Sequence, residues 1–204
     1  MTYRTHMAFG AASAAVLVGP VHDMLGGPPL PHPAITVPAA LLLGSLAGLA
    51  PDLDEPNAAL ARGSWTPQTA PKLFRLLVSL FSLLFFRPLG LLLRGVLGHR
   101  GGTHSLLCAT CATLLVGSTV NIFLGPQYDW VTLSFLFGYL SHIFADSLNP
   151  SGVPLFWPFQ SKKKRWHSLP KALRVPTTTP PTMREQLIAA VMVGVIPVIL
   201  VLSL

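Results

Sequence analysis

The chain has 204 residues, of which 51% are hydrophobic and only 10% are charged, and its formal net charge is +7. Soluble domains carry about 25% charged residues, so this composition excludes an ordinary water-soluble globule and favours a protein dissolved in a bilayer. A basic excess is typical of proteins that bind nucleic acids or anionic membranes. Because the basic residues flank apolar segments, we expect membrane lipid as the partner and no nucleic acid.

Five apolar segments approach the ~20 residues that a membrane-spanning helix needs. They cover residues 7–22, 34–50, 105–124, 130–147 and 186–204. No small-residue cleavage site of a secretory signal follows the first, so we interpret it as a retained helix. The second carries Gly44 and Gly48, whose spacing either permits close helix approach or reflects the small residues common in such helices. We predict an all-α, polytopic membrane helical bundle that forms one integral-membrane domain over residues 1–204.

The segment 73–97 is apolar enough to cross a membrane, but arginines divide it. Arg75, Arg87 and Arg94 lie within it or near its ends, and Pro88 interrupts its middle. An arginine at the bilayer centre costs roughly 2.5–3.5 kcal/mol on insertion scales. We therefore expect a re-entrant or interfacial helical segment whose arginines reach the lipid headgroups.

The distribution of basic residues predicts the orientation. If 73–97 does not cross and the N-terminus is cytoplasmic, all 14 Lys and Arg residues fall in the inner regions 1–6, 51–104 and 148–185. The outer loops then contain none, as the positive-inside rule requires. We expect a multi-pass protein of the bacterial inner membrane with a cytoplasmic N-terminus and a cytoplasmic basic loop over 148–185.

Four short motifs bring ionisable side chains to the cytoplasmic ends of different predicted helices. Alone, each has an ordinary explanation, such as a capping histidine, a solvated acidic turn or a hydrogen-bonded pair. Ionisable residues inside a membrane are costly, however, and usually functional, so together they predict one shared site. The candidate metal ligands are His6, Asp52, Asp54, His99, His104, His142 and Asp146.

Imidazole and carboxylate groups in this pattern point to a divalent metal, with Zn²⁺ or Mn²⁺ as the candidates. Two such cations would activate water and hold a phosphate oxygen. The planar guanidinium of Arg100 suits an anionic group, and Asp54 or Asp146 would act as the base. Thr103 is either a hydrogen-bond partner of a ligand or the N-cap of the next helix. Glu55 is expected to serve as a supporting or solvated charge.

The ordered set of motifs resembles a known family. His6, "APDLDEPN", "HRGGTHSLL" and "GYLSHIFADSLNPSGVPLFWPF" are similar to those of the LexA-regulated, metal-dependent hydrolases of the bacterial inner membrane. The resemblance covers about residues 1–170 and implies a membrane-bound, metal-dependent hydrolase. The family pattern falls on His6, Asp52, Asp54, Arg100, His104, His142 and Asp146, and His99 also matches. A looser similarity links the helical character and the His-x-x-x-Asp element to zinc phospholipase C-like proteins.

These observations predict an enzyme that hydrolyses a phosphoester of a lipid or lipid-linked substrate, such as an anionic phospholipid, at the cytoplasmic leaflet. The catalytic candidates are Asp54, Arg100 and Asp146. Trp157 and Trp166 suit the headgroup region, and the basic run 162–165 would attract anionic headgroups or act only as a topogenic signal. Two alternatives remain: a metal-binding transporter, and a non-catalytic membrane scaffold whose metal fastens helices together.

Overall fold

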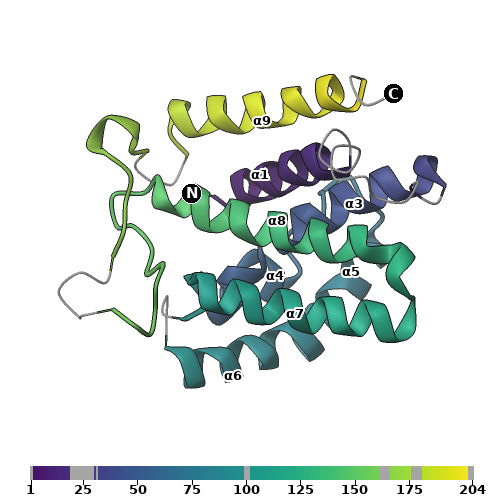
Figure 1. The fold of residues 1–204 in the computed structure, drawn as a ribbon, viewed down its shortest axis with the longest axis horizontal. Helices are drawn as coiled ribbons and strands as arrows, with labels where there is room; N and C mark the ends of the chain where they lie inside the picture. Colours follow the sequence, from purple (N-terminus) through teal and green to yellow (C-terminus); the bar gives the residue numbers. More distant parts are fainter. Residues whose placement is uncertain are drawn as a thin grey trace.

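The computed structural model describes residues 2–18, 30, 32–98, 102–160, 166–175 and 181–201. Over these residues the chain is helical and contains no β-strand beyond one isolated bridge between Val153 and His167. The predicted all-α class is therefore confirmed. Figure 1 shows the long helices lying side by side, with α9, α1, α8 and α7 following one another from top to bottom.

Five helices form the bundle. They are α1 (Tyr3–Val16), α3 (Pro33–Ala47), α7 (Leu106–Phe123), α8 (Asp129–Ser147) and α9 (Met183–Val201). Helix α1 packs against α3, α8 and α9, while α8 also packs against α3 and α7. Short elements connect them: η2 (Ala50–Asp54), α4 (Ala59–Arg62), η4 (Gly102–His104), η5 (Pro126–Tyr128) and η7 (Lys171–Leu173). Helices α1 and α8 are thus the centre of the packing.

Glycines allow α1, α3 and α8 to approach closely. A Cβ atom on Gly10 would lie 2.1 Å from the carbonyl oxygen of Gly44, and one on Gly138 would lie 2.5 Å from the same oxygen. A Cβ atom on Gly48 would lie 2.6 Å from the carbonyl oxygen of His6. The G-x-x-x-G pair of α3 is therefore a packing surface, and it places His6 beside the end of α3.

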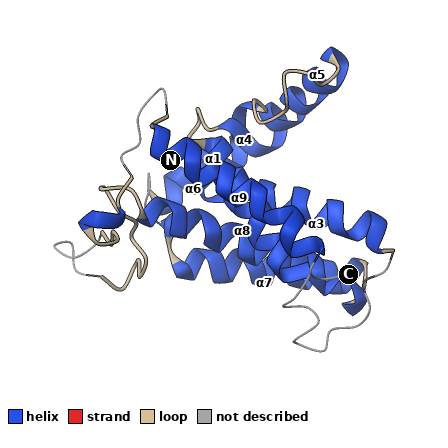
Figure 2. Ribbon diagram, turned by 90° about the horizontal axis from the view of Figure 1, so that it is seen from above, coloured by secondary structure: helices blue, strands red, loops and turns tan. Residues whose placement is uncertain are grey.

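Residues 72–97 form one continuous helical rod. The rod consists of α5 (Lys72–Phe81), a π-helical segment (Ser82–Phe86) and α6 (Arg87–Leu97). Pro88 is tolerated because it lies in the first turn of α6, directly after the π-helical segment. Figure 2 shows α5 projecting away from the bundle.

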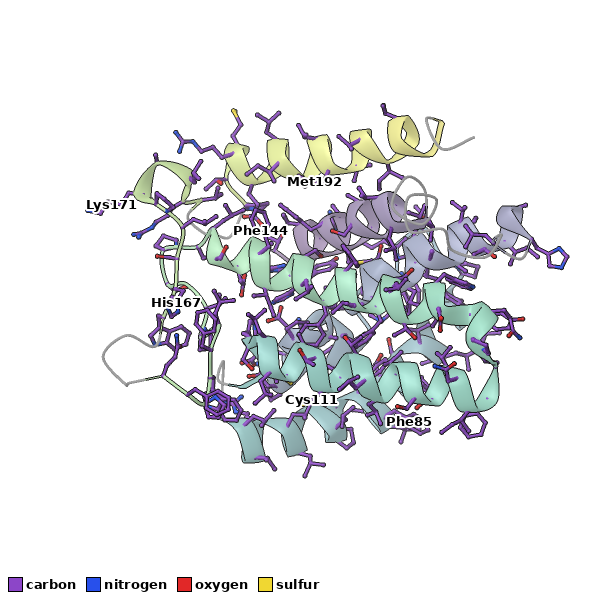
Figure 3. The ribbon with its side chains drawn as sticks, in the orientation of Figure 1. Phe85, Cys111, Phe144, His167, Lys171 and Met192 are labelled. Carbon is purple, nitrogen blue, oxygen red and sulfur yellow. The ribbon has the colours of Figure 1, made fainter. Side chains whose placement is uncertain are left out.

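The rod meets the protein with small side chains and exposes large apolar ones. A Cβ atom on Gly90 would lie 1.9 Å from the carbonyl oxygen of Leu53, and Ser82 is fully buried. Leu84 is 67% exposed, and Phe85, which is labelled in Figure 3, is 59% exposed. Such an amphipathic helix is typical of a segment that meets lipid with its apolar face.

Two helices among the described residues are long and apolar enough to cross a membrane: Lys72–Leu97, with 26 residues, and α7, with 18. This is fewer than the five spans that the sequence predicts, and it includes the segment expected not to cross. Helices α1 and α3 have only 14 and 15 residues, below the ~20 that a span requires. The structure thus supports an all-helical protein with two candidate spans.

Candidate metal centre

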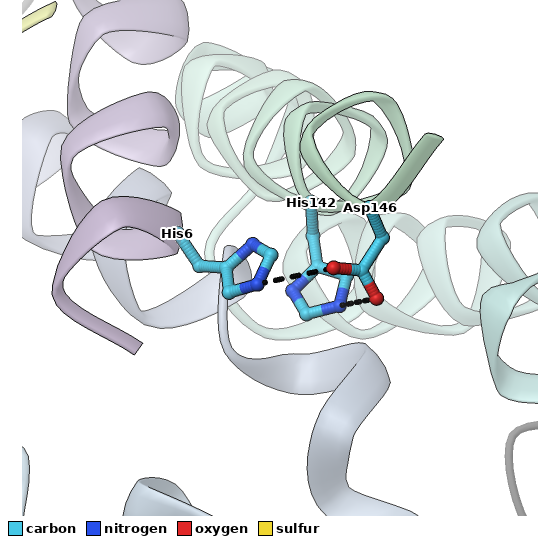
Figure 4. A group of neighbouring side chains, drawn as sticks. All are labelled: His6, His142 and Asp146. Atoms are coloured by element: carbon cyan, nitrogen blue, oxygen red, sulfur yellow. Dashed lines mark ion pairs between the residues drawn. The ribbon is translucent and has the colours of Figure 1, made fainter. Parts of the chain in front are cut away.

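His6, His142 and Asp146 point toward one another from α1 and α8 (Figure 4). The Nε2 atom of His6 lies 3.4 Å from Oδ1 of Asp146, and Nε2 of His142 lies 3.7 Å from Oδ2. The His6 and His142 rings are stacked, with centroids 3.9 Å apart. All three side chains are buried. Two helices that are distant in the sequence therefore supply one group of metal-ligating atoms.

A second group adjoins the first through His142. It adds Asp52 from η2 and His104 from η4. The Nε2 atom of His104 lies 3.4 Å from Oδ1 of Asp52 and 3.6 Å from Oδ2 of Asp146. It also lies 3.2 Å from Nε2 of His142. Within each group the ligand atoms lie within 4.8 Å of one another, so five side chains converge on one small volume.

The spacing of these atoms fits coordination better than direct hydrogen bonding. The four imidazole–carboxylate contacts of His104 and His142 measure 3.4–3.7 Å. Hydrogen bonds between nitrogen and oxygen are usually 2.7–3.2 Å long. Ligands at ~2.0–2.2 Å from a tetrahedral cation are separated from each other by about 3.3–3.6 Å. Two of the four contacts fall within this range and the other two, at 3.7 Å, lie just beyond it, so the spacing is compatible with a shared cation.

Hydrogen bonds on the far sides of two rings hold them in a ligating orientation. The Nδ1–H of His142 donates to the carbonyl oxygen of Gly48 at 2.7 Å, which leaves the Nε2 lone pair directed at the cluster. The Nδ1 atom of His104 lies 3.0 Å from the hydroxyl of Thr103. Of the two roles predicted for Thr103, the structure shows the supporting one, because Ser105 caps α7 by accepting from the N–H of Cys108.

Two supporting residues are missing from the sequence-based site. The amide of Asn149 donates to Oδ1 of Asp146 at 2.9 Å. The hydroxyl of Tyr139 donates to the carbonyl oxygen of Thr103 at 2.5 Å and thereby ties η4 to α8. Both lie three residues from a ligand, Tyr139 before His142 and Asn149 after Asp146. For Tyr139, the i, i+3 spacing on one face of α8 is the signal that could have identified it, whereas Asn149 lies just beyond the end of α8 at Ser147.

Charges within the cluster favour ionised carboxylates. Burial alone would raise the pKa of Asp52, but the imidazoles of His142, His104 and His6 outweigh it and hold that pKa below its usual value. Burial lowers the pKa of His104, but its contact with Asp52 and the charges of Asp146 and Asp54 raise it overall. The cluster therefore attracts positive charge, supplied either by a proton or by a metal ion.

The remaining predicted site residues lie outside the two ligand groups or outside the described part of the chain. Asp54 is 1% exposed but does not belong to either ligand group. His99 and Arg100 lie outside the described residues. Glu55 faces Arg94 of α6, with 3.8 Å between Oε2 and Nη1, which agrees with a supporting charge. The structure thus brings together five of the seven predicted ligands.

Known proteins provide a further comparison. A family model described as YdjM inner membrane protein matches residues 1–204. The chain is 34% identical over 125 residues to the inner membrane protein YdjM of Escherichia coli (strain K12), and equally to that of Shigella flexneri. These residues are 60% of this chain and 48% of the relatives, so the match spans about half of the curated proteins. No solved structure matches.

These findings agree with the motif-based resemblance in one respect, the inner-membrane location. The family description names a location and no activity. The match extends over the whole sequence, including the four elements that supply the clustered histidines and aspartates. The chain belongs to the YdjM inner membrane protein family.

Proposed function

We propose that this protein is a membrane-bound, metal-dependent hydrolase that acts on a phosphoester of a lipid or lipid-linked substrate. The observation that carries the proposal is the convergence of His6, Asp52, His104, His142 and Asp146 from four separate elements at coordinating distances. Burying three histidines and a carboxylate together is costly unless they share a partner such as a metal ion.

The donor set fits Zn²⁺ or Mn²⁺. Histidine nitrogens with carboxylate oxygens suit both ions, and the orientation of His142 by Gly48 is the arrangement that metal-ligating imidazoles usually have. When bound, such an ion lowers the pKa of water and polarises a phosphoryl oxygen. The two overlapping groups of candidate ligands have enough donor atoms to bind one or two ions.

The two best-placed carboxylates have different roles in this proposal. Asp146 directs Oδ1 toward His6 and Oδ2 toward His104 and His142, so it is placed as a shared ligand. The side chain of Asp52 is 31% exposed, while those of the neighbouring imidazoles are at most 2% exposed. Asp52 therefore borders the open side of the cluster, where it can orient a substrate group or accept a proton. Asp54, which is buried, would act through its charge.

The proposed topology places this chemistry at the cytoplasmic leaflet. The start of α1, the start of α7 and the end of α8 lie at one end of the bundle (Figure 1). In the five-span topology predicted from the sequence, with the N-terminus inside, all of the basic residues fall on the cytoplasmic side, whereas only two described helices have the length and hydropathy of a span. Catalytic groups at headgroup depth favour a lipid substrate, with anionic phospholipid as the first class to test.

Burial of the histidines favours one second candidate, a structural metal that fastens four elements together. His6 and His104 are 2% exposed and His142 is 0% exposed. Structural metal sites are closed, whereas catalytic sites keep one open position. The partial exposure of Asp52 distinguishes the two functions, because a catalytic site needs a position open to substrate and a closed structural site does not.

The test begins with the full chain purified in detergent and its metal content measured by mass spectrometry. We expect a stoichiometric divalent metal that is lost in H142A and D146A and retained in H32Q, whose histidine is exposed and distant from the cluster. Phosphoester probes, including phosphatidylglycerol and a chromogenic phosphodiester, should be hydrolysed only by the metal-loaded protein. Metal bound without hydrolysis of any probe would favour the structural role, and absence of metal from the wild type would contradict both.

A further inference from the structure

A cavity of about 1070 Å³ lies on the opposite side of α1 from the metal centre. Tyr3, Met7 and Ala11 form one stripe of α1 along its wall. The other walls come from the loop 62–69, the start of α5 and one residue each of α3 and α9. His6 points away from this stripe toward α8, and no residue of the metal centre lines the cavity.

Four cationic side chains line this cavity and no acidic residue does. They are Arg4, Arg62, Lys72 and Arg75. All four are exposed, and in the part of the chain that the structure describes none of them pairs with a carboxylate. Arg75 reaches only the carbonyl oxygen of Gln68, at 3.4 Å, and Arg4 reaches the hydroxyl of Tyr3, at 3.3 Å. The positive charge around the cavity is thus not neutralised by the protein.

The rest of the wall mixes hydroxyl and amide side chains with apolar and aromatic ones. Met7, Ala11, Leu76 and Val193 line it together with Trp65. A site for a free polar anion would need only the charged rim, whereas a membrane lipid needs a charged rim beside an apolar wall. The volume lies just above the ~300–1,000 Å³ typical of small-molecule sites, so it has room for a headgroup and the start of its acyl chains.

We propose that this cavity is a second, non-catalytic site that binds an anionic phospholipid. Arg4, Arg62 and Arg75 bind phosphate oxygens through their guanidinium groups, and Lys72 adds a further positive charge. The N-terminal end of α5, which carries Lys72, adds the positive end of the helix dipole. The acyl chains leave along Leu76 and Val193. Basic pockets between membrane helices bind such headgroups in general.

This site is independent of hydrolysis at the metal centre, so binding is the measurement that tests it. The full chain in dodecyl maltoside is titrated with cardiolipin, phosphatidylglycerol or phosphatidylcholine, and binding is followed by native mass spectrometry and thermal shift. We expect the two anionic lipids to bind and to raise the melting temperature, and phosphatidylcholine to do neither. Removing one cation, as in R62Q or R75Q, should weaken binding roughly fivefold, and the double variant roughly 25-fold.

R87Q is the matched control, because Arg87 is an exposed arginine of the same helical rod that does not line the cavity. It should bind lipid like the wild type, and every variant should keep the wild-type metal content and gel-filtration profile. Equal binding of phosphatidylcholine, or an equal loss in R87Q, would overturn the proposal in favour of general surface affinity. Full competition by millimolar inorganic phosphate would overturn it in favour of a free-anion site.

Discussion

The carboxylate of Asp146 faces three imidazoles, those of His6, His104 and His142. Its orientation in turn depends on Asn149, whose amide donates to Oδ1 at 2.9 Å. Partners of this kind fix the rotamer of a ligand without touching the metal themselves. At the residue scale, the candidate centre therefore extends beyond its five ligands to the groups that hold them.

N149A tests this supporting role. Because the carboxylate of Asp146 loses its amide donor but keeps its position on α8, metal affinity should fall roughly 10- to 100-fold without being abolished. Competition with a fluorescent chelator gives the dissociation constants of the wild type and the variant. N57A is the control, since Asn57 is exposed and lies outside the cluster, and equal losses in the two variants would refute a specific role for Asn149.

Helix packing sets the distance between the elements that carry the ligands. Gly138 lies on α8 one turn before His142, and its Cβ position is 2.5 Å from the backbone of Gly44. By contrast, a Cβ atom added to Gly194 of α9 would have no other atom within 4 Å. The two glycines are therefore a matched pair that separates helix contact from helix propensity.

We expect G138A to lower stability by about 1–3 kcal/mol, because its methyl group would force α3 and α8 apart. G194A should be neutral or stabilising by up to about 1 kcal/mol, since alanine favours the helix and meets nothing. Thermal unfolding in detergent, followed by circular dichroism, measures the difference. A G138A variant as stable as G194A would show that the close approach of α3 and α8 is not required.

The start of α9 is joined to the start of α1 through a buried carboxylate. Oε1 of Glu185 accepts from the backbone N–H of Thr2 and, at 2.9 Å, from the hydroxyl of Thr5. Glu185 is 0% exposed, and Thr5 directly precedes His6. Helix α9 therefore supports the segment that supplies the first histidine of the centre, although it supplies no ligand itself.

E185A should destabilise the protein by about 1–3 kcal/mol, because it removes the acceptor of the half-buried N–H of Thr2 and leaves the buried hydroxyl of Thr5 with only the Thr2 hydroxyl as a partner. E185Q keeps an acceptor oxygen and should recover most of the loss. The melting temperatures of both variants, with limited proteolysis near residue 2, provide the measurement. Q186A, which alters an exposed neighbour, is the control and should behave like the wild type. If the E185A variant were as stable as Q186A, the proposed connection between α9 and α1 would be contradicted.

The exposed surface of the whole molecule is unusually apolar. Large hydrophobic side chains are exposed along the rod 72–97, α7 and α9, among them Leu84 at 67%, Leu115 at 70% and Val198 at 57%. Soluble monomers rarely expose continuous apolar areas larger than a few hundred Å². Membrane lipid accounts for this surface, in agreement with membership of an inner-membrane family.

Lipid contact of the rod can be measured directly. In a background without Cys108 and Cys111, a fluorophore attached through L84C should be quenched by brominated lipid in liposomes and protected from aqueous iodide. A fluorophore attached through N57C, on the exposed turn before α4 and outside the lining of the basic cavity, should show the reverse pattern. Equal quenching of both positions by iodide would show that the apolar face of the rod does not meet lipid.

The sequence predicted the helical class and the convergence of five ligands, because the motifs lie at corresponding ends of apolar segments. It did not predict that 72–97 is one continuous rod. That outcome depends on small side chains along the rod, such as Gly90, which meets the backbone of Leu53 in η2, and the buried Ser82. Asn149, Tyr139 and the basic cavity were also missed, because their roles depend on contacts between elements distant in the sequence.

His142 belongs to both groups of candidate ligands, and this would limit the stoichiometry of a metal centre. Its Nδ1–H is occupied by the carbonyl oxygen of Gly48, so the ring has a single lone pair to offer. It can therefore bind only one ion at a time. A second ion would have to be bridged through Asp146 with fewer histidines, and a titration would show sequential loading, with one tight and one weak step.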